Sequence, residues 1–166
     1  MILLRECQVV DMRPVCQNID MSDKDARVEL ETSVGYLLKE AASALRSAME
    51  AVLRPLGMSI THYACLELLA QRPGLSNSDL ARGAFVSRQS MNVLLQSLER
   101  DGYVTRPERA SEGRVLPTRL TALGRSRLDV ASAAVRGVED RMRSDLDAVE
   151  REQLRLLLRK CVAALN

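Results

Sequence analysis

Aromatic residues are scarce in this sequence, which has three tyrosines, one phenylalanine and no tryptophan among its 166 residues. Sandwiches and barrels of β-strands depend on aromatic and β-branched side chains that suit a pleated, half-buried surface. Hydrophobic residues still make up 46% of the chain, and most are Leu, Val, Ala or Met. Such residues favour packed helices. We therefore predict a mainly α-helical protein with one domain of ordinary size or a small domain with helical extensions.

Metal-binding and catalytic residues are also few. Histidine occurs once, at His62, and the four cysteines (Cys7, Cys16, Cys65 and Cys161) show no metal-ligand spacing. A zinc site needs about four ligands in a recognisable arrangement, so we expect no metal and no cofactor. With a single histidine, no catalytic nucleophile is evidently paired with a general base, and the chain has no Gly-rich phosphate loop. We therefore expect no enzymatic activity.

The chain has no hydrophobic run long enough for a signal peptide or a membrane span. The apolar start is interrupted by Arg5 and Glu6. These features predict a cytoplasmic protein with reduced thiols and no membrane partner. Residues 1–29 carry mixed charges and no sustained period, and we interpret them as an N-terminal arm that is ordered only if it docks.

Positive charge is concentrated in the middle of the chain. The formal net charge is only +2, whereas residues 71–127 hold ten Arg against five acidic residues, which leaves −3 for the remainder. Arginine suits bidentate contacts with phosphate and guanine, although a GC-rich coding sequence is a plainer explanation of the arginine content. A basic module on a mildly acidic frame is consistent with nucleic-acid binding.

Two short helices are predicted within residues 75–101. Ser76, followed three residues later by Asp79, forms a capping box for the first helix, and Ser87 caps the second. Apolar residues of the second helix recur at i, i+3, i+4 and i+7 and therefore share one face. They are Met91, Leu94, Leu95 and Leu98. The opposite face carries side chains suited to base edges and phosphates, namely Gln89, Val93, Gln96 and Arg100, flanked by Ser90 and Asn92.

A β-hairpin is predicted directly after the second helix. Gly102 supplies the positive φ at which a helix often ends. A short strand at residues 103–106, a polar turn and a returning strand at residues 114–121 follow. Helix, turn, helix and hairpin in this order form a winged helix-turn-helix. In that motif the second helix enters the DNA major groove, and the hairpin reaches an adjacent minor groove.

In these segments the sequence resembles the MarR (multiple antibiotic resistance regulator) family of transcriptional regulators. The resemblance covers roughly residues 33–165. It rests on LSNSDLAR, on SRQSMNVLLQSLERDGYVTR, on EGR followed by LTALG, and on LDAVEREQLRLLLRKCVAAL. The wing departs from the family pattern, since Glu112, Gly113 and Arg114 stand where the family usually carries Asp-x-Arg. The resemblance implies a homodimer, held by the first, fifth and sixth helices, that binds double-stranded DNA.

DNA contacts are predicted from three places: the start of the first helix, the second helix and the wing. The predicted residues are Ser76, Asn77, Ser78, Ser87, Arg88, Gln89, Ser90, Asn92, Val93, Gln96, Arg106, Arg109 and Arg114. A solvated charge run is the alternative interpretation of the wing arginines. Their place on a hairpin directly after a polar-faced helix favours DNA, and Arg114 matches the arginine that the family sends into the minor groove.

Long helical patterns flank the DNA-binding module. Apolar helix faces that extend beyond such a module must be buried, and packing against a second copy of the chain, related by two-fold symmetry, is the simplest way to bury them. We therefore divide the chain into four parts. These are the arm (1–29), a dimerisation helix (30–58), the winged helix-turn-helix module (59–121) and C-terminal dimerisation helices (122–166).

The resemblance further implies a repressor that binds a pseudo-palindromic operator and is released by a small phenolic or carboxylate effector. Tyr36, Met58, His62 and Cys65 are the candidate ligand-binding residues, although helix surface and core packing is the plainer role for His62 and Cys65.

Two other functions stay open. One is a redox sensor that acts through Cys7 and Cys16, because a sensing thiol must be accessible. The other is a winged-helix module for protein contacts or for non-specific DNA binding.

Overall fold

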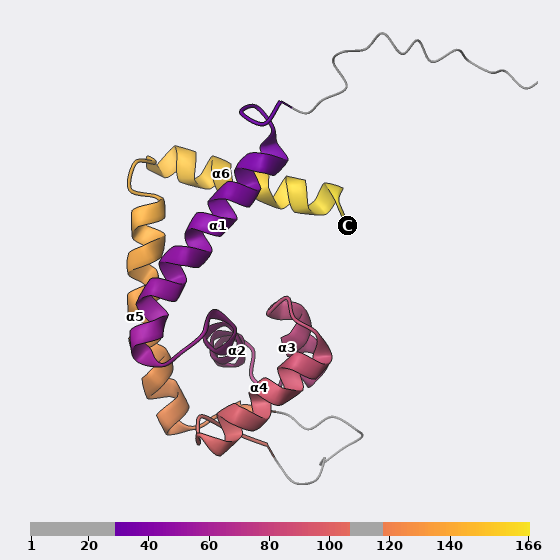
Figure 1. Cartoon of the computed structure of the whole chain (residues 1–166), viewed down its shortest axis with the longest axis vertical. Coiled ribbons are helices and arrows are strands. Elements are labelled where there is room, and N and C mark those ends of the chain that lie inside the picture. The colour runs from indigo at the N-terminus through magenta and orange to yellow at the C-terminus, as the bar shows by residue number, and fades with distance from the viewer. Residues whose placement is uncertain (1–28, 107–117) are drawn as a thin grey trace, which may run out of the picture. The chain divides into compact units, whose positions relative to one another are not determined.

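The computed structural model describes residues 29–106 and 118–166 (Figure 1). The N-terminal half of this region contains α1 (Val34–Leu53), the 3-10 helix η1 (Arg54–Leu56), α2 (Ile60–Gln71), α3 (Asn77–Gly83) and α4 (Arg88–Arg100). Then follow β1 (Val104–Thr105), β2 (Arg119–Leu120), α5 (Ala122–Met142) and α6 (Ala148–Ala164). The predicted fold, mainly α with a winged helix-turn-helix, is confirmed. Within the described ranges no helix has the length and hydropathy needed to cross a membrane.

Five of the helices begin at a side chain that accepts a hydrogen bond from the third backbone N–H of the helix. The caps of α2, α3, α4, α5 and α6 are Ser59, Ser76, Ser87, Thr121 and Asp147. Such a bond satisfies a backbone donor that has no partner inside the helix, and stabilises the fold by about 1 kcal/mol. The sequence predicted two of these caps, Ser76 and Ser87.

The hydrophobic core lies where α2, α3, α4 and α5 meet. Helix α2 packs against both α3 and α5, and α3 packs against α4. The predicted apolar face of α4 is buried, because Met91, Leu95 and Leu98 are at most 2% exposed and Leu94 is 9% exposed. Burying such a side chain stabilises the fold by about 1.5–3 kcal/mol. The face of α4 opposite this core is consequently fixed toward solvent.

The base of the wing is a two-stranded antiparallel sheet. Val104 pairs with Leu120, and Thr105 pairs with Arg119. Val104 and Leu120 are buried, so one side of the hairpin base joins the core. Gly102 has a φ of 74°, as its predicted position after the helix requires. The remainder of the wing, with Arg109 and Arg114, lies outside the described residues.

The first turn of α5 lies against Gly102 and Tyr103, which lie between α4 and β1. The Thr121 hydroxyl donates to the Gly102 carbonyl over 2.6 Å, and the Thr121 N–H donates to the Tyr103 carbonyl over 3.1 Å. A Cβ on Gly124 would lie 2.0 Å from the Tyr103 carbonyl oxygen, closer than two such atoms can approach. Glycine at position 124 is therefore what allows α5 to start here.

Helix α6 is well formed but buries nothing in a single chain. The Asp147 carboxylate accepts from the Glu150 N–H over 2.9 Å, and the Glu150 carboxylate accepts from the Asp147 N–H over 2.8 Å, which together form a capping box. No residue of α6 is buried. Its large exposed apolar side chains are Val149, Leu154, Leu156, Leu157, Leu158 and Val162.

Candidate nucleic-acid interface

The outward face of α4 carries six of the thirteen predicted DNA contacts. All six are exposed to solvent: Arg88, Gln89, Ser90, Asn92, Val93 and Gln96. Val93 is 62% exposed even though it is apolar, which suits a side chain that packs against a thymine methyl group. Amide side chains beside it, such as Gln89 and Asn92, have the donor and acceptor pair that matches adenine in the major groove.

The hydroxyls at the start of α4 bind the helix itself. Ser87 Oγ accepts from the Ser90 N–H over 3.0 Å, and the two serine hydroxyl oxygens lie 2.8 Å apart. This cap fixes where the helix begins. It thereby sets which side chains of the first turn face outward.

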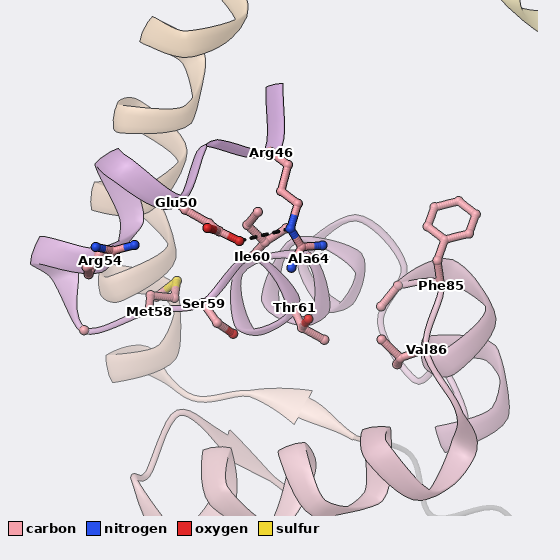
Figure 2. Close-up of a pocket in the computed structure, with 12 residues that line it drawn as sticks. Arg46, Glu50, Arg54, Met58, Ser59, Ile60, Thr61, Ala64, Phe85 and Val86 are labelled. Carbon is pink, nitrogen blue, oxygen red and sulfur yellow. Dashed lines mark ion pairs between the residues drawn. The ribbon is translucent and has the colours of Figure 1, made fainter. Parts of the chain in front are cut away.

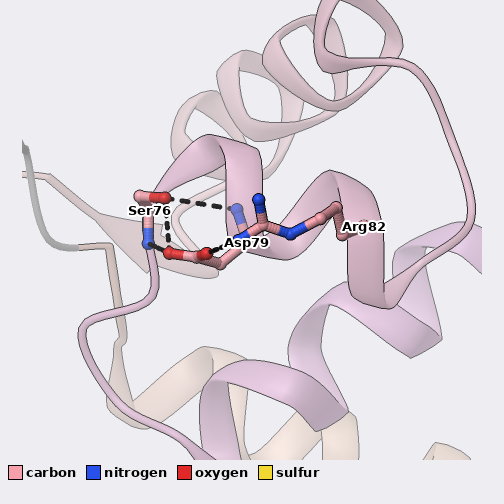
Figure 3. A network of polar contacts seen from close by, with 3 residues as sticks. All are labelled: Ser76, Asp79 and Arg82. Carbon is pink, nitrogen blue, oxygen red and sulfur yellow. Dashed lines mark hydrogen bonds and ion pairs between the residues drawn. The ribbon is translucent and has the colours of Figure 1, made fainter.

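The start of α3 is held by a network of three side chains (Figure 3). The Ser76 hydroxyl donates to Asp79 Oδ2 over 2.6 Å, and the Asp79 N–H donates back to Ser76 Oγ over 3.2 Å. Hydrogen bonds from Ser76 lower the pKa of the Asp79 carboxyl, and the ion pair with Arg82 lowers it further. Ser76 was predicted as a DNA contact, and the structure places it in this capping box.

Asn77 joins the two helices of the helix-turn-helix. Its Nδ2 donates to the Arg88 carbonyl over 3.3 Å. Its Oδ1 is buried and has no hydrogen-bond partner among the described residues. Asn77 is therefore placed to orient the first turn of α4, and its neighbour Ser78 is half-buried.

Arg106 lies at the base of the wing and is bound to α4. Its Nε and Nη2 donate to Glu99 Oε2 over 3.0 and 2.6 Å. The Arg106 side chain is only 20% exposed. The sequence predicted a DNA contact for Arg106, and in this structure its guanidinium is bound by Glu99.

A cavity of about 640 Å³ lies beside the start of α2 (Figure 2). Its polar side chains include Arg46 and Glu50, which form an ion pair at 3.1 Å, and Arg54. Met58, Ile60 and Val86 line it with apolar surface, and Phe85 lies at its edge. Arginines beside apolar side chains suit a small organic anion, because the guanidinium binds a carboxylate bidentately.

The four predicted ligand residues are not all at this cavity. Met58 lines it and also lines a smaller cavity of about 40 Å³ together with His62. Cys65 is fully buried in the core and lines neither of the two. Tyr36 is exposed and belongs to a separate compact unit that ends at Leu37.

His62 serves in the cap of α2. Its Nδ1 accepts from the Ser59 N–H over 3.3 Å and lies 2.9 Å from Ser59 Oγ. Burial lowers the pKa of His62, and nearby Asp101 opposes that shift. The imidazole is consequently neutral at pH 7, which leaves Nδ1 free to accept.

Cys65, one of the two described cysteines, is a poor candidate for redox sensing. Burial raises the pKa of the Cys65 thiol to about 12, so the reactive thiolate is scarce at neutral pH. Cys161 is partly exposed on α6. Cys7 and Cys16, the predicted sensor thiols, lie outside the described residues.

Sequence reasoning missed Phe85, Arg46 and Arg54. Phe85 has a φ of 56°, and its side chain is 95% exposed. The turn between α3 and α4 has no glycine at this position, and that could have drawn attention to it. The arginines lie on the helix predicted for dimerisation, where nothing in the sequence separated them from other surface charges.

Comparisons with known proteins agree with this architecture. Residues 56–114 match the model of the MarR family. The HTH-type transcriptional repressor Rv2887 of Mycobacterium tuberculosis is 41% identical over 130 residues, which are 78% of this chain and 94% of that protein. The chain belongs to the MarR family. The resemblance predicted from the sequence is thereby confirmed.

Solved structures of this MarR family relative extend the comparison. The complex of the M. tuberculosis protein with DNA has a TM-score of 0.66 and 39% identity, and the match covers 78% of this chain and 97% of that chain. Its complex with salicylic acid has a TM-score of 0.65 and 41% identity, with coverage of 78% and 96%. That relative therefore binds both DNA and a small aromatic carboxylate.

Proposed function

We propose that this protein is a homodimeric, sequence-specific DNA-binding repressor that a small aromatic effector releases from its operator. One observation carries the proposal. The outward face of α4 is solvent-exposed and presents Gln89, Asn92, Val93 and Gln96, while the opposite face is locked in the core. Membership of a family of transcriptional regulators and the DNA complex of the M. tuberculosis relative support the same function.

The DNA-reading surface combines sequence-specific and non-specific contacts. Side chains of α4 read base edges in the major groove, and Arg88, at its first turn, binds phosphate. Wing residue Arg114 reaches the minor groove, as the family resemblance implies, and Arg109 adds a further DNA contact from the same wing. Ser76, Ser87 and Asn77 contribute mainly by fixing the two helices. Their exposed atoms add phosphate contacts.

The exposed apolar side chains of α6 support dimerisation. A 17-residue helix without a buried residue leaves an apolar surface that monomeric proteins rarely expose. A second copy buries that surface, with residues 30–58 and 122–166 forming the dimer and residues 59–121 reading DNA. Two reading helices related by two-fold symmetry then face half-sites about 10 bp apart.

The effector binds the cavity beside α2. Arg46 and Arg54 supply positive charge for a carboxylate, and Met58 and Ile60 supply apolar contact for a ring. The M. tuberculosis relative has been solved with salicylic acid and with p-aminosalicylic acid, which are single-ring acids of this chemistry. The protein works in the cytoplasm as a regulator without catalytic activity.

DNase footprinting on a selected site, sedimentation and salicylate titration together test this function. We expect a footprint with two-fold symmetry, a dimer in solution and release of the DNA by salicylate. A monomer or an asymmetric footprint would contradict the proposal. A non-specific coating or protein-interaction module is distinguished by equal affinity for all DNA sequences, because a regulator prefers its site by about 10³ or more.

A further inference from the structure

The turn between α3 and α4 has the hydrogen bonds of a Schellman motif. The Val86 N–H donates to the Ala81 carbonyl over 3.0 Å, and the Phe85 N–H donates to the Arg82 carbonyl over 3.3 Å. This motif places the residue after the helix cap in the left-handed region, where glycine is favoured. Phe85 occupies that position with a φ of 56°. It is the only residue other than glycine with positive φ in ranges 29–106 and 118–166.

Neither packing nor backbone preference explains a phenylalanine at this position. Its side chain is 95% exposed, so it contributes nothing to the core. A bulky residue in the left-handed region is strained. Strained residues gather at ligand clamps and switch regions, where the strain serves the mechanism. Contact between the Phe85 ring and a ligand would offset both the exposure of the ring and the strain of its backbone.

Phe85 stands at the edge of the cavity that we assign to the effector. Figure 2 shows its ring at one end of the lining residues and Arg54 at the other end. Between them lie apolar side chains of α2 and of the turn, including Ile60 and Val86. The cavity thus has the Arg46–Glu50 ion pair on α1, the Arg54 guanidinium on η1 and the exposed Phe85 ring at the end opposite Arg54.

We propose that Phe85 is the aromatic wall of the effector site and couples effector binding to the position of α4. The inference rests on the proposed function. It adds to that function a specific effector-binding residue and a structural connection from the effector site to α4. A single-ring carboxylate places its anionic group at Arg46 or Arg54. Its ring packs against the Phe85 ring, in the offset or edge-to-face geometry that aromatic pairs prefer. Ring contact selects aromatic acids over aliphatic ones.

The position of Phe85 in the chain connects the effector site to the DNA-contacting residues of α4. Only Val86 separates it from Ser87, the N-cap of α4. A change of the Phe85 backbone as its ring turns onto the effector shifts this cap and the first turn of α4. That turn carries Arg88 and Gln89, which are proposed DNA contacts. Binding at the cavity therefore changes the position of the DNA-reading side chains.

The test uses the full chain, a labelled DNA site selected from a random pool, and salicylate as the probe. Salicylate affinity is measured by calorimetry, and DNA release is followed by fluorescence anisotropy. Phe85→Gly removes the ring and the strain, Phe85→Leu removes the ring but keeps apolar volume, and Phe85→Tyr keeps the ring. Cyclohexane carboxylate serves as the nonaromatic comparison.

We expect Phe85→Gly and Phe85→Leu to weaken salicylate binding by about 3- to 10-fold, the range of an aromatic pair. Both variants should need more salicylate for DNA release. Both should also show a smaller preference for salicylate over cyclohexane carboxylate. Phe85→Tyr, which keeps the ring, should match the wild type in salicylate affinity and in the salicylate concentration needed for DNA release.

Two results would overturn the inference while leaving the proposed function intact. One is unchanged salicylate binding and release in both Phe85→Gly and Phe85→Leu. The other is a large loss of DNA affinity in these variants without salicylate, which would make Phe85 a DNA contact. Wild-type protein that binds its site but not salicylate would refute the effector class and the inference together.

Discussion

The Arg106 guanidinium donates two hydrogen bonds to Glu99 Oε2, from Nε over 3.0 Å and from Nη2 over 2.6 Å. This pair ties the first strand of the wing to the last turn of α4. In winged helix-turn-helix proteins the wing and the second helix of the motif, here α4, approach DNA in neighbouring grooves. The Arg106–Glu99 bond therefore holds the base of the wing against α4.

Arg106→Ala should weaken DNA binding through the loss of this bond, and Glu99→Ala should weaken it similarly. The pair is partly exposed, so we expect a stability loss below about 1 kcal/mol in either variant. A double-mutant cycle on DNA affinity checks the account, and the double variant should be little worse than either single variant. If Arg106→Ala alone lowers affinity and salt dependence while Glu99→Ala does not, Arg106 contacts phosphate directly.

Gly124→Ala should destabilise the fold by about 3 kcal/mol or more, because the new Cβ would lie 2.0 Å from the Tyr103 carbonyl oxygen. Gly137→Ala is a matched control in the same helix, since a Cβ there meets nothing within 4 Å. That control should stabilise the protein by about 0.5–1 kcal/mol, the helix preference of Ala over Gly. Urea unfolding measures both. Equal effects would mean that α5 can begin elsewhere.

Stability should fall when the pH drops from about 7 toward 5, in part because of His62. Burial lowers its folded-state pKa below the ordinary value of 6.5. The unfolded chain therefore binds a proton first, and stability is lost as pH falls through 6.5 toward the folded-state pKa. His62→Gln keeps an acceptor for the cap of α2 and does not titrate. Its melting temperature should fall less over this range, and parallel curves for the two proteins would contradict the assignment.

Arg114→Ala should weaken binding to every DNA sequence and reduce the slope of log affinity against log salt by about one, since one fewer counterion is released. Arg114 lies outside the described residues, so this prediction comes from the family resemblance alone. Arg136→Ala, an exposed arginine of α5, controls for the loss of a positive charge elsewhere. An unchanged slope and affinity would mean that the wing of this protein has lost its minor-groove contact.

Local features of this protein were predictable from the sequence. Helix caps such as Ser76 and Asp147 satisfy backbone groups within three residues, and the buried face of α4 follows from its 3.6-residue period. The order of the elements then identified the winged helix-turn-helix. The outward face of α4 followed from the same period, because burying one face exposes the other.

Features that depend on tertiary contact were not predictable. The requirement for Gly124 arises from the Tyr103 carbonyl of another element. The ion pair of Arg106 with Glu99 was not predicted, because nothing in the sequence shows that Glu99 is within reach. The αL conformation of Phe85 follows from how α3 and α4 meet, and its residue type would have argued against that conformation.

The central claim is that the exposed face of α4 reads DNA sequence, and the affinity ratio between a selected site and a scrambled duplex tests it most directly. We predict a ratio of about 10³ or more for the wild-type protein at physiological salt. Gln89→Ala should lose about 1–3 kcal/mol on the selected site and much less on the scrambled duplex. A wild-type ratio near one, or an equal loss on both duplexes in Gln89→Ala, would contradict sequence reading by α4.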